Sequence, residues 1–155
     1  EHKHLYMTKG MVPEEDYEIE FGKAEVMTEG DDVTIVAWSH MLLKAMEAAE
    51  TLAAENIRAE VINLRTLSPL DTDTIMTSVA KTNRVVIAQE AVRRGGVASD
   101  IASYIQEEEF YSLDAPIEIV AGLNIPIPFN LTLEKASVPQ ADDIVAAAKR
   151  TLEHA

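Results

Sequence analysis

The stretch that decides the fold is residues 33–64, which read VTIVAWSHMLLKAMEAAETLAAENIRAEVINL. Its first five residues form a short apolar, β-branched run that is typical of a buried strand. The middle carries apolar residues at helical spacing, namely Leu42, Leu43, Ala45, Met46, Ala49, Leu52 and Ala53. Ser39 is the expected N-cap of this helix. A second strand is predicted at residues 59–64, so the stretch is a strand–helix–strand unit with parallel strands.

The same alternation continues on both sides. Further strands are predicted at residues 24–27, 84–88 and 117–120, and further helices from about Asp71, at 97–109 and at 140–152. The turn sequence Glu29-Gly30-Asp31-Asp32 favours an antiparallel hairpin between the first two strands. The predicted fold is therefore three-layer α/β/α, with a mostly parallel five-stranded sheet and one antiparallel strand. We expect residues 24–155 to form this domain and residues 1–23 to form an extended arm.

The composition excludes several classes of partner. The chain has 155 residues with 27 Asp and Glu against 13 Lys and Arg, a formal charge of −14, which argues against binding nucleic acid or an anionic membrane. No apolar run approaches the ~20 residues that a membrane-spanning helix needs. There are no cysteines, which removes disulfides and thiolate metal sites. These features are typical of a soluble protein of a reducing compartment.

The negative charge is concentrated in one segment. Residues 95–134 contain no Lys or Arg, and they hold seven acids, Asp100, Glu107, Glu108, Glu109, Asp114, Glu118 and Glu134. Clustered like charge steers an oppositely charged partner, so this segment is a candidate docking surface for a basic partner. A solvated surface that only confers solubility is the alternative interpretation.

A second candidate is the loop Arg93-Arg94-Gly95-Gly96, which lies between a predicted strand and a predicted helix. Two guanidinium groups beside a helix amino terminus would suit a phosphate or carboxylate. The alternative is a sharp strand-to-helix turn whose arginines pair with acidic neighbours or with a partner chain. Neither a GxGxxG nor a GxxxxGK[ST] motif supports nucleotide binding.

Sequence motifs for catalysis or metal binding are absent. The histidines His2, His4, His40 and His154 show no HExxH or comparable spacing. His2 and His4 could chelate a metal together, but we interpret them as part of a solvated arm. Ser39-His40 belongs to no GxSxG elbow. We therefore predict no catalytic, cofactor-binding or metal site within this chain.

Five phrases occur in an order that resembles a known family: residues 63–71 (NLRTLSPLD), 79–86 (VAKTNRVV), Glu90-Ala91 with 95–99 (GGVAS), 113–116 (LDAP) and 125–129 (IPIPF). They resemble the carboxyl-terminal domain of the beta subunit of thiamine-diphosphate-dependent 2-oxo acid dehydrogenases, a transketolase C-terminal-like domain. The resemblance spans nearly the whole chain. The opening Glu1-His2-Lys3 resembles the end of a preceding pyrimidine-binding domain, so we expect the chain to be part of a longer subunit.

The resemblance implies a role in assembly. In the full enzyme, thiamine diphosphate and magnesium would be held by other parts, during oxidative decarboxylation of a 2-oxo acid with acyl transfer to lipoyl-lysine. The implied partners are an alpha subunit, a second beta subunit and the basic subunit-binding domain of a dihydrolipoyl acyltransferase. Matched onto this sequence, the docking positions for that domain are Asp114 and Glu118. The implied location is a bacterial cytoplasm or the mitochondrial matrix.

Alternatives remain open on substrate and on class. Residues 98–103 resemble branched-chain members, whereas residues 125–129 resemble pyruvate members. Asn63 departs from the Asp that is frequent in the family, and the tail at 152–155 lacks the aromatic end of some members. Within the superfamily, the chain could instead belong to a transketolase or a deoxyxylulose-phosphate synthase. Outside it, the alternative is a free-standing flavodoxin-like module that binds a small anion at residues 93–96.

Overall fold

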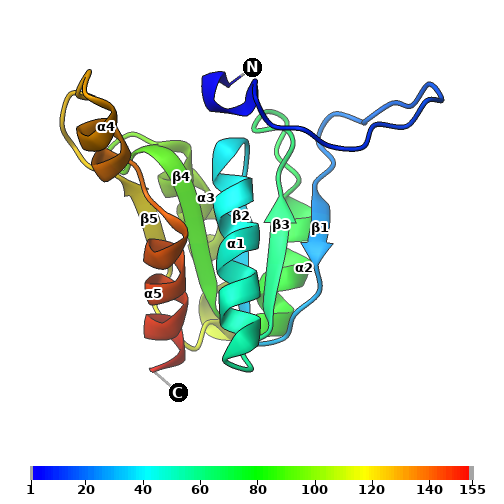
Figure 1. Ribbon diagram of the computed structural model, residues 1–155. Coiled ribbons are helices and arrows are strands. Elements are labelled where there is room, and N and C mark those ends of the chain that lie inside the picture. The colour runs from blue at the N-terminus through cyan, green and yellow to red at the C-terminus, as the bar shows by residue number, and fades with distance from the viewer. Residues whose placement is uncertain (1, 154–155) are drawn as a thin grey trace.

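One five-stranded sheet forms the centre of the computed structural model, which describes residues 2–153 (Figure 1). The strand order is β1-β3-β2-β4-β5. The strands are β1 (Glu25–Thr28), β2 (Val33–Ala37), β3 (Ala59–Asn63), β4 (Val85–Val92) and β5 (Glu118–Gly122). β2 to β5 are parallel, and β1 runs antiparallel to β3. The predicted sheet is thus confirmed.

Helices cover both faces of the sheet, which confirms the three layers (Figure 1). α1 (His40–Ala54) and α5 (Ala141–Leu152) pack on one face, and α2 (Thr72–Thr82) and α3 (Val97–Glu109) lie on the other. A short α4 (Leu131–Ser137) and two 3-10 turns, η1 (Lys3–Leu5) and η2 (Phe110–Ser112), complete the elements. Among the described residues, no helix is long and apolar enough to cross a bilayer.

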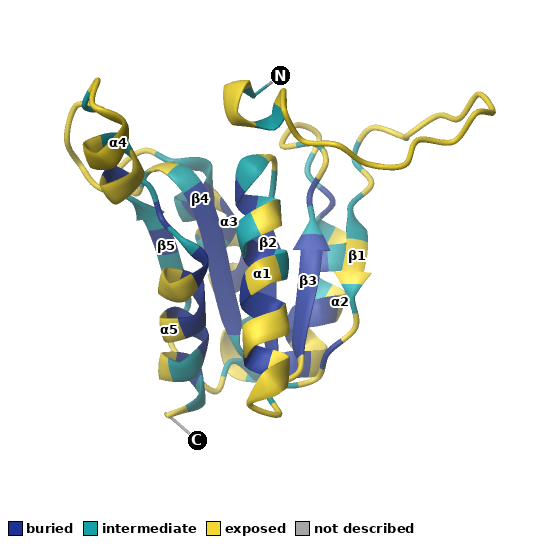
Figure 2. Cartoon of the chain, in the orientation of Figure 1, coloured by how far each residue is buried: buried dark blue, intermediate teal, exposed yellow. Residues whose placement is uncertain are grey.

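The core consists of two apolar layers, one on each side of the sheet. Ile35 and Val61 point toward α1 and α5, whereas Val36 and Ile62 point toward α2 and α3. All five residues of β2 are buried, as expected for a central strand that is covered on both faces (Figure 2). Even Thr34 is buried, where its Oγ1 lies 2.7 Å from Oγ1 of Thr82 and 3.1 Å from the carbonyl oxygen of Ser78.

The predicted hairpin is wrong, because β1 pairs with β3 and does not touch β2 in the sheet. The connection between β1 and β2 crosses the start of β3, where Asp32 accepts a hydrogen bond of 2.6 Å from the amide of Arg58. A Cβ on Gly30 would lie 2.4 Å from the carbonyl carbon of Ala59. The glycine therefore permits a close approach of two backbone segments, and it does not form a hairpin turn.

Two exposed apolar segments lie at the end of the sheet where the parallel strands finish (Figures 1 and 2). One is the arm, where residues 6–21 are all exposed and include Met11 and Phe21. The other comprises residues 123–133, whose exposed side chains include Phe129 and Leu131. α4, which begins in this segment and extends beyond it, was not predicted. It follows Asn130, whose side chain accepts hydrogen bonds from the amides of Thr132 and Leu133.

Candidate functional site

The predicted docking acids lie at the amino end of β5, and each is paired with an arginine. Oδ2 of Asp114 lies 3.2 Å from Nη2 of Arg84, which precedes β4. Glu118 accepts two hydrogen bonds from Arg150 of α5, from Nε at 3.3 Å and Nη2 at 2.8 Å. The hydrogen bond that Arg150 donates to Glu118 raises the pKa of the Arg150 guanidinium. Both arginines come from outside residues 95–134. The segment lacks a base in its own sequence, but the fold supplies one to each of these two acids.

The two pairs form one continuous polar surface. Arg84 contacts Asp114 with Nη2 and also donates from Nε to the carbonyl oxygen of Thr151, the neighbour of Arg150. The side chain of Asp114 is 48% exposed and that of Glu118 is 29% exposed, so both carboxylates are accessible to a partner. A basic partner would compete there with the two arginines that already contact these acids.

Among the described residues, none of the other acids of the segment forms an ion pair with Arg84 or Arg150. Glu107, Glu108 and Glu109 end α3, whose last turn carries no basic residue, so their charge opposes the helix dipole. Glu134 lies at the other end of the sheet, 3.4 Å from Nε2 of His4. The seven acids therefore do not all lie on one surface, because Glu134 lies at the opposite end of the sheet from Asp114 and Glu118.

The predicted anion loop lies at the carboxyl end of β4, at the opposite end of the sheet from Asp114. Gly95 has a φ of +66° with open space around it, whereas a Cβ on Gly96 would lie 2.2 Å from Nε2 of Gln89. Gln89 is 1% exposed; it donates to the carbonyl oxygen of Val92 at 2.9 Å and accepts from the amide of Ala98 at 3.0 Å. Gly96 therefore makes room for a protein side chain.

The amino end of α3 is largely satisfied by protein groups. Besides the amide of Ala98, the amide of Ser99 donates to the carbonyl oxygen of Gly96 at 3.0 Å, and its hydroxyl donates to that of Arg93. Arg93 and Arg94 are exposed and form no ion pair within residues 2–153. Anion binding at this loop stays a prediction that would depend on the two guanidinium groups.

Gln89 is a residue that the sequence interpretation missed. An amide side chain in the middle of an apolar strand was the signal, because a buried amide must find hydrogen-bond partners. It orders the loop that carries both arginines, so the loop conformation depends on it.

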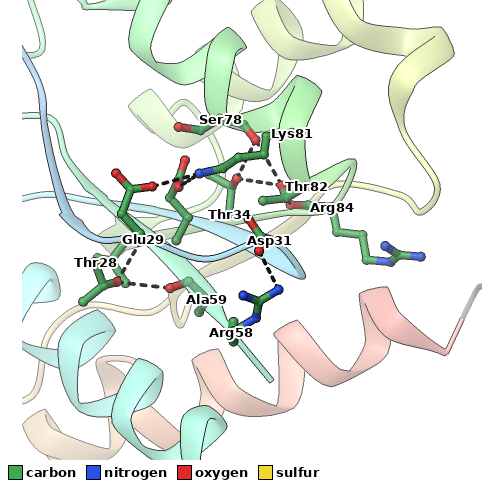
Figure 3. A network of polar contacts seen from close by, with 12 residues as sticks. Thr28, Glu29, Asp31, Thr34, Arg58, Ala59, Ser78, Lys81, Thr82 and Arg84 are labelled. Atoms are coloured by element: carbon green, nitrogen blue, oxygen red, sulfur yellow. Dashed lines mark hydrogen bonds and ion pairs between the residues drawn. The ribbon is translucent and has the colours of Figure 1, made fainter. Parts of the chain in front are cut away.

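Two acids are buried among the described residues, and both carboxylates already bind protein groups. Glu60, 2% exposed on β3, is paired with Lys81 of α2, whose Nζ also lies 3.0 Å from Oε2 of Glu29 (Figure 3). Burial alone would raise the pKa of Glu60, but hydrogen bonds from Lys81 and Ser78 outweigh it and hold the pKa below its usual value. The Glu60 carboxylate therefore has a structural role.

Asp71 is the second buried acid and the N-cap of α2. Its carboxylate accepts hydrogen bonds from the amide of Ala24 at 2.8 Å, and from the amide and the hydroxyl of Thr74 at 3.1 and 2.8 Å. Burial acts to raise the pKa of Asp71, but these hydrogen bonds outweigh it and lower the pKa. Neither buried acid is free to exchange a proton with a ligand.

Comparison with known proteins identifies the family of the chain. Residues 22–144 match the family described as "Transketolase, C-terminal domain". The chain is 46% identical over 153 residues to the beta subunit of an acetoin:2,6-dichlorophenolindophenol oxidoreductase of Cupriavidus necator, covering 99% of this chain and 45% of that subunit. It is 47% identical over 150 residues to a pyruvate dehydrogenase E1 component subunit beta of Rickettsia felis, covering 97% and 46%. The chain thus spans about half the length of the curated relatives it matches.

Solved structures show the same fold. A structure described as a split gene transketolase, inactive beta4 tetramer, superposes with a TM-score of 0.77 at 36% identity, over 89% of this chain and 44% of that one. A transketolase of Pichia stipitis superposes with a TM-score of 0.58 at 13% identity, over 85% and 18%. The matched residues and the strand order lead to one assignment: the chain belongs to the family of transketolase C-terminal domains.

Proposed function

We propose that this chain is the assembly and docking domain of the beta subunit of a thiamine-diphosphate-dependent 2-oxo acid dehydrogenase. The observation that carries the proposal is the identity of 47% to a pyruvate dehydrogenase E1 component subunit beta over 97% of the chain. The beta subunit of the acetoin oxidoreductase, which is 46% identical over 99% of the chain, is a relative named for a hydroxyketone and not for a 2-oxo acid. The five sequence phrases that resemble the same family lie within the matched residues and agree with it. In the complete enzyme the reaction would be oxidative decarboxylation of a 2-oxo acid, with transfer of the acyl group to lipoyl-lysine.

The described residues do not fit the cofactor. Thiamine chemistry requires a carboxylate that can exchange a proton with the aminopyrimidine, yet the buried acids Glu60 and Asp71 are held by Lys81 and by backbone amides. Arg93 and Arg94 could contact a phosphate, but the adjacent amides at the start of α3 are used internally. We therefore assign the thiamine diphosphate and magnesium of the full enzyme to other parts of the assembly.

The surface supports a role in assembly. The arm and residues 123–133 expose large apolar side chains at the same end of the sheet, among them Met11, Phe21, Phe129 and Leu131. Contiguous exposed apolar surface is typical of protein interfaces. We infer that the alpha subunit, a second beta subunit or the rest of this subunit covers these two segments. The acidic surface at Asp114 and Glu118, at the other end, is the proposed docking surface for the acyltransferase subunit-binding domain, which would compete there with Arg84 and Arg150.

The transketolase alternative has weaker support. The split gene transketolase is 36% identical over 89% of the chain, against 46–47% for the dehydrogenase subunits. The substrate is open between pyruvate and a related compound, because one relative is named for acetoin and another for pyruvate.

Reconstitution tests the proposal. The isolated chain should not decarboxylate pyruvate or a branched-chain 2-oxo acid. The same domain within a complete beta subunit, mixed with the alpha subunit, thiamine diphosphate and magnesium, should do so, and the preferred substrate would then identify the enzyme. Decarboxylation by the isolated chain would contradict the division of roles, and transfer of ketol groups between sugar phosphates by the full assembly would favour a transketolase.

A further inference from the structure

Three histidine rings gather at the carboxyl end of the sheet, although one of them is far from the other two in sequence. His2 and His4 come from the first turn of the arm, and His40 is the first residue of α1. The ring centroids of His2 and His4 lie 5.6 Å apart, and each lies 5.3 Å from that of His40. Glu90 of β4 and Glu134 of α4 border the same cluster.

Three of these side chains direct a ligand atom toward one point. Nε2 of His2 lies 2.8 Å from Oε2 of Glu90, and Nδ1 of His40 lies 3.4 Å from the same oxygen. All three atoms lie within 4.8 Å of one another. Tetrahedral zinc with bonds of about 2.0–2.1 Å keeps its ligand atoms roughly 3.3–3.4 Å apart. Small side-chain rotations are therefore sufficient to enclose an ion.

His40 provides an independent reason to expect a ligand. Its Nδ1 is buried and lacks a hydrogen-bond partner among the described residues, since the contact with Glu90 does not have hydrogen-bond geometry. Buried polar atoms in native proteins nearly always have a partner, and an orphan of this kind indicates a missing water or ion. A metal ion placed between His40 and Glu90 would satisfy this nitrogen.

We infer that His2, His40 and Glu90 form a binding site for one divalent transition-metal ion of the zinc class. Two imidazoles and one carboxylate suit zinc and its neighbours, whereas magnesium and calcium prefer oxygen ligands alone. The fourth position is left for water or for His4, which lies beside the other two rings. This inference replaces the expectation, based only on the absence of a sequence motif, that the chain holds no metal.

Metal binding requires a change in the position of the ring proton of His2. Nδ1 of His2 now accepts a hydrogen bond of 3.3 Å from the amide of His4, which places the proton on Nε2. Coordination through Nε2 requires the other tautomer, so this long hydrogen bond is lost. His40 would ligate through Nδ1, so its proton must be on Nε2. Both histidines ligate in their neutral forms, and the ionised Glu90 partly balances the charge of the ion.

The site would fix the arm to the sheet. Its ligands come from the arm, α1 and β4, and His2 and Glu90 are 88 residues apart in sequence. A metal that joins distant parts of a chain stabilises the folded state, because it binds the folded arrangement and not the unfolded chain. The ion would hold the first turn of the arm over the start of α1.

Metal titration tests the site. The 155-residue chain, freed of metal with a chelator, is titrated with zinc chloride in a calorimeter, and its thermal midpoint is measured with zinc and with magnesium. We expect one zinc per chain, a higher midpoint with zinc and no change with magnesium. Cobalt(II) should give the visible absorption of a tetrahedral nitrogen and oxygen site. Absence of zinc binding would overturn the inference.

Variants decide whether these three residues are the ligands. His40→Gln and Glu90→Gln should each weaken zinc binding roughly tenfold or more. Since both could disturb the fold, His2→Gln on the arm is the second test, with the same expected loss and an unchanged midpoint without zinc. Glu134→Gln, which borders the cluster without belonging to the three ligands, is the matched control and should bind zinc like the parent chain. Equal binding by His2→Gln, His40→Gln and the parent would show adventitious binding and contradict the site.

Discussion

At the scale of single residues, Glu60 is the most deeply buried charged side chain among the described residues, and Lys81 is its cation. Replacing Lys81 with Met leaves a carboxylate that is 2% exposed without its cation. We expect the free energy of unfolding at pH 7 to fall by about 2–3 kcal/mol, somewhat less than for a fully buried pair, because the Lys81 side chain is 37% exposed. Chemical denaturation of both chains measures the difference.

The pH dependence identifies the cause of this loss. In the parent chain the pKa of Glu60 is lowered, so its stabilising effect is present above its usual value of about 4.3 and is lost as the pH falls below it. In Lys81→Met, burial without the cation raises the pKa of Glu60, so that variant gains stability as the pH falls. The difference in the free energy of unfolding between the parent chain and Lys81→Met should therefore become smaller from pH 7 toward pH 4. A constant difference would show that lost packing, not the charge, is responsible.

A double variant provides the control for the charge argument. Lys81→Met combined with Glu60→Gln leaves no ionised group buried at this position, so it should be more stable at pH 7 than Lys81→Met alone. Glu29 also contacts Lys81, but its side chain is 82% exposed, and water compensates for the lost contact.

At the scale of elements, Asp71 joins the start of α2 to the segment that enters β1. Asp71→Ala removes the acceptor for the amides of Thr74 and Ala24, and we expect a loss of about 1–2 kcal/mol at pH 7. Because the pKa of Asp71 is lowered, its contribution is present above about pH 3.9 and is lost as the pH falls through the lowered value. The loss caused by the substitution should thus shrink between pH 4 and pH 2.

Asp71→Asn separates the cap from the charge. Asparagine is as good an N-cap as aspartate, so at pH 7 this variant should be more stable than Asp71→Ala. Thermal or urea unfolding at several pH values measures both. If Asp71→Asn and Asp71→Ala were equally unstable, the hydrogen bonds at Thr74 and Ala24 would not be the reason for the loss.

The elements also show where sequence patterns succeed. Periodicity located the four longer helices and all five strands. The helices and the central strands bury apolar faces that leave a pattern in the sequence, whereas the edge strand β1 has no buried residue and was found from its short β-prone run. The position of β1 beside β3 could not be read that way, since a turn sequence such as residues 29–32 shows that the chain bends and does not show which strand it reaches. α4 was missed because only Ser137 in it is buried, which leaves no apolar face to detect.

At the scale of the whole molecule, the sequence predicted where the acidic residues cluster but did not predict their ion-pair partners. The segment without bases was correctly identified, yet Arg84 and Arg150, which pair with Asp114 and Glu118, lie about 30 residues away along the chain. The histidine cluster has the same origin, because His2, His40 and Glu90 meet only after three elements have packed. Long-range pairings of this kind depend on topology, which local spacing does not encode.

These pairings sharpen the docking hypothesis. Asp114→Asn with Glu118→Gln removes two negative charges and also leaves Arg84 and Arg150 unpaired, facing a basic partner. We expect association with the acyltransferase subunit-binding domain to slow about tenfold at low salt, with little difference at high salt. Stopped-flow mixing measures the rates. Glu50→Gln with Asp142→Asn is the matched control, because it removes the same charge from exposed helical positions elsewhere and should change the rate far less.

For Arg150→Gln we expect the opposite change in the association rate. It frees Glu118 from its two hydrogen bonds while Asp114 keeps its contact with Arg84, so the acidic surface becomes more negative. Association with the same basic domain should accelerate at low salt, at a cost of less than about 1 kcal/mol in stability for an exposed pair. If Arg150→Gln slowed association as strongly as the loss of the two acids does, the arginine itself would be the contact, and Asp114 and Glu118 would only position it.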